Sequence, residues 1–150
     1  MTEQARHEAL PRRRAERAGI SLRKAHPLIG QAVVIGDGRK YLTALITVDA
    51  DNIKAFAEER GFSAESLDEL LRNHEVIDLI RSVVEEKNTE LASFETIKDF
   101  RFVPEFTIDN GLLTPTLKPR RGRISMMYEG LIVRLYDLIE GAQARGGDGS

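Results

Sequence analysis

The 150-residue sequence contains no cysteine and no tryptophan, and aromatic residues make up only 6% of it. Without cysteine there is no disulfide, no thiolate nucleophile, no zinc–thiolate site and no iron–sulfur cluster. Uninterrupted apolar runs are only a few residues long, and residues 1–19 lack the apolar centre of a signal peptide. We therefore expect a cytoplasmic protein without a transmembrane segment.

Neither sign of charge dominates the chain, because 22 lysine and arginine residues face 24 aspartate and glutamate residues. A net charge of −2 gives no general attraction to nucleic acid or to an anionic membrane. The charges are unevenly spread, with a net +4 over residues 1–24 and a net −6 over residues 25–150. A basic arm can bind nucleic acid or an acidic surface, but arginines interspersed with glutamates are more typical of a solvated helix face.

Apolar residues at 41% and charged residues at 31% are typical of a globular protein, and 150 residues suffice for one domain with a core. The two ends of the chain depart from this pattern. Residues 1–19 are rich in arginine without apolar periodicity, and residues 141–150 are mostly small or polar. We expect a basic, mobile N-terminal extension over residues 1–19 and a disordered tail over residues 141–150.

The apolar pattern predicts helices and strands in a compact order. Strands are predicted at residues 31–35, 41–48 and 96–106, and helices at residues 21–25, 53–60, 74–91 and 123–139, with a short helix from Ser63 or Ser66. The Asp37-Gly38 step suits a tight turn, so the first two strands should form an antiparallel hairpin. Together these elements predict an α+β fold with a small antiparallel sheet of about three strands flanked by helices.

No familiar catalytic constellation is visible. The three histidines, His7, His26 and His74, are far apart, and we interpret them as a surface, a helix-end and a helix-start group. Asp49 and Asp51 offer oxygen ligands to a cation, but capping of the following helix explains both more simply. We therefore expect no metal site in this chain.

One segment, residues 112–123 with the sequence LLTPTLKPRRGR, is more informative. It places Lys118 between two prolines, so an ammonium is presented from a restrained loop. A fixed cation can stabilise charge on a transferring phosphorus or carboxylate oxygen, provided that the loop docks over a nucleotide held elsewhere. The alternative is that the neighbouring arginines begin a solvated helix, although the helix dipole mildly disfavours cations there. Both interpretations remain open from the residues alone.

The stretch LLTPTLKPRR closely resembles the C-terminal lysine motif of long-chain fatty-acyl-CoA synthetases, which belong to the adenylate-forming superfamily. Two other segments resemble the small C-terminal domain of the same enzymes: HPLIGQAVVIGDGRKYLTALITVDADN at residues 26–52 and NTELASFETIKDFRF at residues 88–102. The similarity covers about residues 20–140, in the order and spacing of the family. It implies that these residues form one adenylate-forming-enzyme C-terminal-like domain.

The resemblance implies that Lys118 contacts the ATP α-phosphate and the fatty-acid carboxylate while acyl-AMP forms. Its role would be electrostatic stabilisation and positioning. Thr116, Arg120 and Arg121 beside it are further candidates for nucleotide contact. In the family, the small domain then rotates and coenzyme A displaces AMP to give the thioester. ATP and Mg²⁺ are thus implied as co-substrate and ion together with a core domain, and coenzyme A as acyl acceptor.

The family's large N-terminal domain carries the phosphate loop and the acyl tunnel, and neither fits in this chain. The hinge and hairpin expected before Ser21 are replaced by the arginine-rich segment, and Pro119 stiffens the lysine loop further. We expect the isolated chain to be inactive. The favoured interpretation is a catalytic half, which either acts in trans on a separate adenylation core domain or is a fragment of an originally continuous synthetase. The alternatives are a non-catalytic binding or regulatory module and, ranked last, a nucleic-acid module that uses the basic arm.

Overall fold

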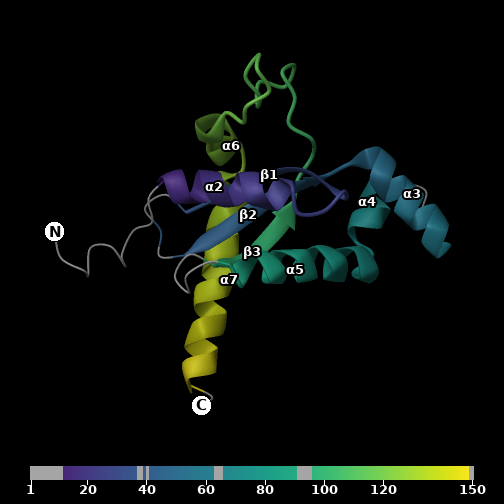
Figure 1. Ribbon diagram of the computed structural model, residues 1–150. Helices are drawn as coiled ribbons and strands as arrows, with labels where there is room; N and C mark the ends of the chain where they lie inside the picture. Colours follow the sequence, from purple (N-terminus) through teal and green to yellow (C-terminus); the bar gives the residue numbers. More distant parts are fainter. Residues whose placement is uncertain (1–11, 37–38, 40, 63–65, 91–95, 149–150) are drawn as a thin grey trace.

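A computed structural model describes residues 12–36, 39, 41–62, 66–90 and 96–148 of the chain (Figure 1). The predicted Asp37-Gly38 turn, a helix start at Ser63, the last residue of the helix predicted at 74–91, and residues 1–11 and 149–150 lie outside these residues. The elements in chain order are α2 (Arg12–Arg23), β1 (Ile29–Ile35), β2 (Leu42–Val48), α3 (Ala50–Arg60), α4 (Leu67–Leu71), α5 (His74–Asn88), β3 (Ile97–Phe102), α6 (Arg121–Met127) and α7 (Glu129–Asp148).

The strands form one sheet in the order β1-β2-β3. β1 and β2 pair antiparallel, as the hairpin prediction requires, and the α+β class with three strands is confirmed. The sheet is mixed rather than wholly antiparallel, because β3 runs parallel to β2. The reason is the connection: α3, α4 and α5 together carry the chain back to the end of the sheet where β2 began, as a parallel crossover requires.

The helix boundaries follow local side-chain chemistry. The side chains of Asp49, Ser66 and Asn73 accept hydrogen bonds from backbone N–H groups in the first turns of α3, α4 and α5. Gly61, at φ +73°, ends α3 in the left-handed conformation that glycine adopts without strain. The capping interpretation of Asp49 is thereby confirmed.

The first face of the sheet is covered by α2, α3, α4 and α5. Their buried apolar side chains share one core with the strands, among them Ala15, Leu22, Val34, Ile46, Ile53, Ile80 and Phe100. α2 packs against β1 with Ala15, Ala18 and Leu22 almost wholly buried. Residues 12–19 thus belong to a packed helix, residues 1–11 lie outside the described part, and the extension over residues 1–19 stays a prediction. From Arg12 onward the segment is helical, and its small side chains let the helix approach the sheet closely.

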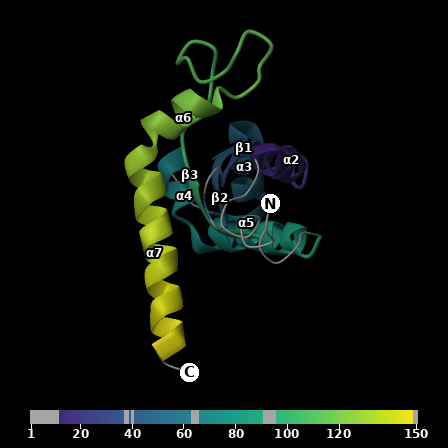
Figure 2. The ribbon, with the colours of Figure 1, turned by 90° about the vertical axis from the view of Figure 1, so that its left-hand side faces the viewer.

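The second face is covered by the segment that follows β3 and by α6 and α7. Figure 2 shows α2 and α7 on opposite sides of the strands. A second core of buried side chains lies here, including Val33, Leu45, Val103, Phe106, Leu112, Ile124 and Ile132. β1 and β2 therefore have buried side chains on both faces, whereas Lys98 on β3 is exposed.

The C-terminal helix differs from its prediction in two ways. The helix predicted over residues 123–139 is divided into α6 and α7, because the backbone of Tyr128 leaves the helical range at φ −105° and ψ 20°. Ile124 and Ile132, on either side of the break, are both buried in the second core. In addition, α7 continues to Asp148, beyond the predicted end at residue 139, and the disordered tail over residues 141–150 stays a prediction.

Tyr136 on α7 ties the helix to the hairpin. Its hydroxyl lies 2.7 Å from the carbonyl oxygen of Tyr41 and 3.1 Å from that of Ile35, so it bridges the two sides of the β1–β2 connection. Its ring stacks on the Tyr41 ring with centroids 5.4 Å apart, and the Arg39 guanidinium lies 4.3 Å from the Tyr136 centroid. Burial raises the pKa of the Tyr41 hydroxyl, and the charge of Glu140 adds to this effect.

We expect Tyr136→Phe to lower the free energy of unfolding by about 1–2 kcal/mol, because it leaves two buried carbonyl groups without this donor. Urea denaturation followed by circular dichroism measures the change. Tyr128→Phe is the matched control, since Tyr128 lies only half-buried at the α6–α7 break. An unchanged unfolding midpoint for Tyr136→Phe would show that the bridge does not stabilise the hairpin.

Candidate functional site

The segment that carries Lys118 begins where β3 ends. The N–H of Val103 still donates to the carbonyl of Ile46 in β2, at 2.9 Å, but Pro104 has no N–H with which to continue the ladder. The strand predicted over residues 96–106 therefore ends at Phe102. Phe106 continues the apolar pattern, yet its side chain is buried in the second core rather than in a strand.

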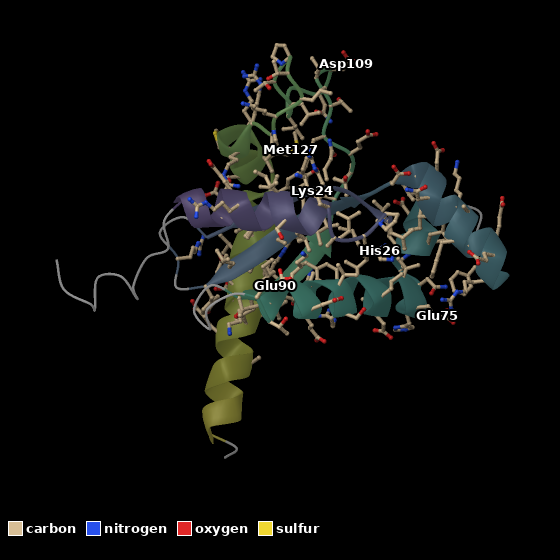
Figure 3. All side chains as sticks on the ribbon, in the orientation of Figure 1. Lys24, His26, Glu75, Glu90, Asp109 and Met127 are labelled. Atoms are coloured by element: carbon tan, nitrogen blue, oxygen red, sulfur yellow. The ribbon has the colours of Figure 1, made fainter. Side chains whose placement is uncertain are left out.

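The chain turns at Asp109, Asn110 and Gly111, and the hydrogen bonds of Asn110 organise this turn. The Asn110 Oδ1 accepts from the N–H groups of Thr107 and Leu112, at 3.0 and 3.1 Å, and the Asn110 N–H donates to the Thr107 hydroxyl at 2.9 Å. Gly111 follows at φ +80°. The turn reverses the chain and delivers Leu112 and Leu113 into the second core. Figure 3 shows Asp109 at the far end of this projection, with Met127 near its base.

A second turn, over residues 114–118, presents Lys118. Thr114 closes it with both backbone and side chain: its N–H donates to the Lys118 carbonyl at 2.8 Å, and its hydroxyl accepts from the Lys118 N–H at 3.0 Å. The N–H of Leu117 donates to the Thr114 carbonyl at 2.8 Å. An isolated bridge between Leu113 and Pro119 joins the two sides of the turn. The position of the Lys118 backbone is therefore fixed by local hydrogen bonds.

Leu117 has a backbone conformation that is unusual for a leucine. It is the one non-glycine residue in the described part of the chain with a positive φ, at 65°, a region that costs an ordinary L-residue roughly 1–2 kcal/mol. Its side chain is 61% exposed, so burial offsets little of this cost. The hydrogen bonds from Thr114 hold the turn in this conformation, which turns the chain so that Lys118 is exposed.

The structure places the four candidates for nucleotide contact, Thr116, Lys118, Arg120 and Arg121, in different surroundings. Lys118 and Thr116 are exposed at the tip, where the Thr116 hydroxyl lies 3.1 Å from that of Thr114. Arg120 is half-buried, and its Nε lies 3.4 Å from the Leu113 carbonyl. Arg121 points into the body of the protein. Their role in nucleotide contact stays a prediction.

Arg121 serves as an anchor between the end of the loop and the sheet. Its side chain is only 13% exposed, its Nη2 donates to the carbonyl of Val34 in β1 at 2.8 Å, and its Nε lies 4.0 Å from the Glu16 carboxylate on α2. By contrast, Lys118 makes no ion pair with a carboxylate of the described residues. Of these two cations, Lys118 is the one placed to meet an anion from outside.

A groove with a volume of about 750 Å³ lies between this loop and the ends of β1 and β2. Among the described residues, its lining includes four acidic residues, Asp49, Asp51, Glu105 and Asp109, but only one basic residue, Arg23. This excess of negative charge disfavours a polyphosphate in the groove. Lys118 is not among the lining residues.

The histidines occupy separate places. The Nδ1 of His26 accepts from the Leu28 N–H at 3.1 Å just after α2, His74 begins α5, and His7 lies outside the described residues. Within the described ranges, no group of three His, Asp or Glu side chains is placed to hold a metal ion. A search of the same ranges finds no helix that is both long and apolar enough to span a membrane.

The three-stranded sheet, the covering helices and the projecting lysine loop define the C-terminal domain of an adenylate-forming enzyme. The family described as AMP-binding enzyme C-terminal domain matches residues 18–140. The chain belongs to this family. The resemblance drawn from the three sequence segments is thus confirmed.

The chain is similar to curated fatty-acid–CoA ligases. It is 34% identical over 116 residues to the long-chain-fatty-acid–CoA ligase FadD15 of Mycobacterium tuberculosis, covering 76% of this chain and 19% of the ligase. It is 34% identical over 119 residues to long-chain-fatty-acid–CoA ligase 1 of Cavia porcellus, covering 75% and 16%. The chain therefore spans less than a fifth of the length of these two relatives.

Solved structures share the fold. The adenylation domain of a carboxylate reductase from Mycobacterium chelonae superimposes with a TM-score of 0.62 at 25% identity, over 81% of this chain and 17% of that one. The A-PCP didomain of a carboxylic acid reductase from Segniliparus rugosus, in complex with AMP, gives a TM-score of 0.65 at 22% identity, over 87% and 17%. The fold is that of one small part of such enzymes.

Sequence reasoning missed two residues of the site, Thr114 and Gln31. Thr114 lies four positions before Lys118, a spacing at which a threonine side chain can close a turn on a backbone N–H, so local turn chemistry could have indicated it. Gln31 is a polar residue in an otherwise apolar strand. Its side-chain amide donates a hydrogen bond to the carbonyl of Phe106, which lies 75 residues away in the sequence, and no local sequence pattern connects the two.

We expect Thr114→Val to speed amide hydrogen exchange at Lys118 about 2- to 12-fold, because the variant removes the acceptor of that N–H, a bond worth about 0.5–1.5 kcal/mol. NMR-detected exchange measures the change. Thr116→Val is the matched control, since it keeps the bond from Lys118 to Thr114. If the two variants exchange equally, the Thr114 hydroxyl does not hold the turn.

Proposed function

We propose that this domain supplies Lys118 to an ATP-dependent acyl-adenylation catalysed on a core domain, with a long-chain fatty acid as substrate. The observation that carries the proposal is an exposed, unneutralised ammonium on a hydrogen-bonded turn within an adenylate-forming C-terminal domain. The names of the curated relatives support the substrate class. The proposal includes a cytoplasmic location, with which a chain lacking cysteine is compatible.

In the first half-reaction, the fatty-acid carboxylate attacks the α-phosphorus of ATP, and pyrophosphate leaves. In the transition state, negative charge is spread over the phosphoryl oxygens and the attacking carboxylate. The charge on the carboxylate falls as the mixed anhydride forms. The Lys118 ammonium, placed beside both groups, stabilises this charge and holds the reactants together. In this proposal Lys118 acts by electrostatic stabilisation and positioning, not by nucleophilic attack.

In the second half-reaction, coenzyme A attacks the carbonyl of acyl-AMP through its sulfur, and AMP leaves as the thioester forms. Mg²⁺ is proposed as the ion that accompanies ATP. The described residues offer no cluster of ligands that fits the ion. The proposal therefore assigns none of them to Mg²⁺.

The core domain is needed because this chain offers a single exposed cation at the tip of a loop and an acidic groove beside it. One ammonium contributes to charge stabilisation, but it cannot by itself orient ATP and a carboxylate for in-line attack. The alternative is a non-catalytic binding or regulatory module that keeps the fold. The catalytic and the non-catalytic proposals differ in whether Lys118 affects the rate of adenylation on a core domain.

We expect the purified chain to form no acyl-CoA from palmitate, ATP and coenzyme A, because Lys118 alone cannot orient ATP and the carboxylate for reaction. Thioester formation is followed by mass spectrometry, with full-length FadD15 as the positive control. Sustained turnover by the pure chain would contradict the need for a core.

The main prediction concerns a reconstituted pair. Adding this chain to a FadD15 core that lacks its own C-terminal domain should raise palmitate-dependent pyrophosphate release. Lys118→Ala should lower the gain by on the order of 100-fold or more, as loss of a preorganised charge-stabilising group does. Lys118→Arg should restore it only in part, because a planar guanidinium does not occupy the place of a compact ammonium.

Lys98 provides the matched control, since it is an exposed lysine on β3, away from the loop. Lys98→Ala should leave the gain unchanged. The unfolding free energy of Lys118→Ala should stay within about 0.5 kcal/mol of the wild type, because truncation of an exposed side chain leaves no cavity. Equal rates for the wild type and Lys118→Ala, with complex formation demonstrated, would leave the non-catalytic alternative.

A further inference from the structure

We propose that Gln31 is a positioning residue for the lysine loop, which is defined here as residues 103–120. Its carboxamide holds the backbone of Phe106, through which the loop leaves the sheet. The catalytic part of this proposal rests on the proposed function of Lys118. The conformational part does not, and the experiment below separates the two.

The contact between Gln31 and Phe106 is bidentate. The Phe106 N–H donates to the Gln31 Oε1 at 2.8 Å, and the Gln31 Nε2 donates to the Phe106 carbonyl at 2.8 Å. Both polar groups of one backbone residue are thus satisfied by one side chain, although Phe106 has left the sheet. Since the Phe106 side chain is 1% exposed, the loop is held here by burial and by hydrogen bonds together.

Thr47 fixes the orientation of the Gln31 carboxamide. It pairs with Gln31 across the β1–β2 ladder, is 2% exposed, and donates its hydroxyl to the Gln31 Oε1 at 3.1 Å. A flipped amide would set an NH₂ group against the Phe106 N–H and an oxygen against its carbonyl. The Gln31 side chain therefore has one satisfied orientation, which suits a positioning role.

A bulge in β1 directs Gln31 toward the loop. Ile29 pairs with Val48 and Gln31 with Thr47, so Gly30 is an additional residue in the strand. Consequently Ile29 belongs to the first core, whereas Gln31 reaches Phe106 of the second. A Cβ at Gly30 would lie 3.2 Å from the Thr47 hydroxyl and from the Val48 carbonyl, so glycine suits the bulge.

The other end of the lysine loop is attached to the same strand. Arg121, directly after the loop, donates to the Val34 carbonyl, three residues along β1 from Gln31. β1 thus holds both ends of the segment whose tip carries Lys118. Loss of the Gln31 bonds would leave the turn at residues 114–118 intact, since it closes on itself, but would loosen its attachment to the sheet.

The experiment compares Gln31→Met, which keeps the length of the side chain but makes neither bond, with Tyr136→Phe as a control that removes hydrogen bonds to Ile35 and Tyr41 instead of to the loop. Two readouts are used. The first is the ¹⁵N heteronuclear NOE of residues 116–118 in the isolated chain. The second is the gain in pyrophosphate release with the FadD15 core, measured also in a Lys118→Ala background.

We expect the heteronuclear NOE at residues 116–118 to fall in Gln31→Met and to stay unchanged in Tyr136→Phe. With the core, Gln31→Met should lower the maximal rate at least 10-fold with little change in the KM for ATP. In the Lys118→Ala background it should cause no further loss, because Gln31 acts through Lys118. If Gln31→Met does not fold, Gln31→Glu is used, which keeps the acceptor but loses the donor to Phe106.

An unchanged NOE in the Gln31 variant, or an equal fall in Tyr136→Phe, would overturn the positioning role. An additional rate loss in the Lys118→Ala background would likewise overturn it, because the effect would then be general to the fold. If the wild-type chain gives no gain with the core, the proposed function fails, while the NOE comparison still decides whether Gln31 orients the loop.

Discussion

The attachment of the lysine loop to β1 is the constraint on which the rest of the site depends. β1 is an edge strand of the sheet, yet both of its faces are buried, by α2 on one side and by the loop and α6 on the other. Phe106, Leu112 and Leu113 anchor the loop by burial, and Gln31 and Arg121 anchor it by hydrogen bonds to and from the backbone. The first and last residues of the loop are thus held against the sheet. Among the described residues 114–118 of the turn, Lys118 is the one exposed cation.

The local parts of this arrangement could be predicted from the sequence. Period-two and period-3.6 patterns indicated β1, β2, α3 and α5, and cap chemistry at Asp49 and Ser66 indicated where helices begin. Lys118 could be singled out because prolines on both sides restrain it and because the motif around it resembles a family. These signals lie within a few residues of the features that they predict.

The parts that could not be predicted depend on partners far away in the sequence. The burial of Ala15 and Ala18 needs β1 beneath them, so an arginine-rich segment that seemed mobile forms α2. The parallel pairing of β3 depends on the path of three intervening helices. Arg121 was a candidate for phosphate contact, but its guanidinium is directed to Val34, 87 residues away, which the local sequence does not reveal.

The central claim is that Lys118 reaches the reacting phosphate on a core domain. An adenylate that carries a reactive acyl group on its phosphate tests this directly, since a nearby lysine that loses its proton to water can attack the acyl carbon, forming an amide that keeps the acyl label as the bond to AMP breaks. With the FadD15 core present, mass spectrometry should find the label on Lys118 and not on Lys98, and without the core it should find neither labelled. Equal labelling of the two lysines, or labelling of Lys118 that does not depend on the core, would contradict the account.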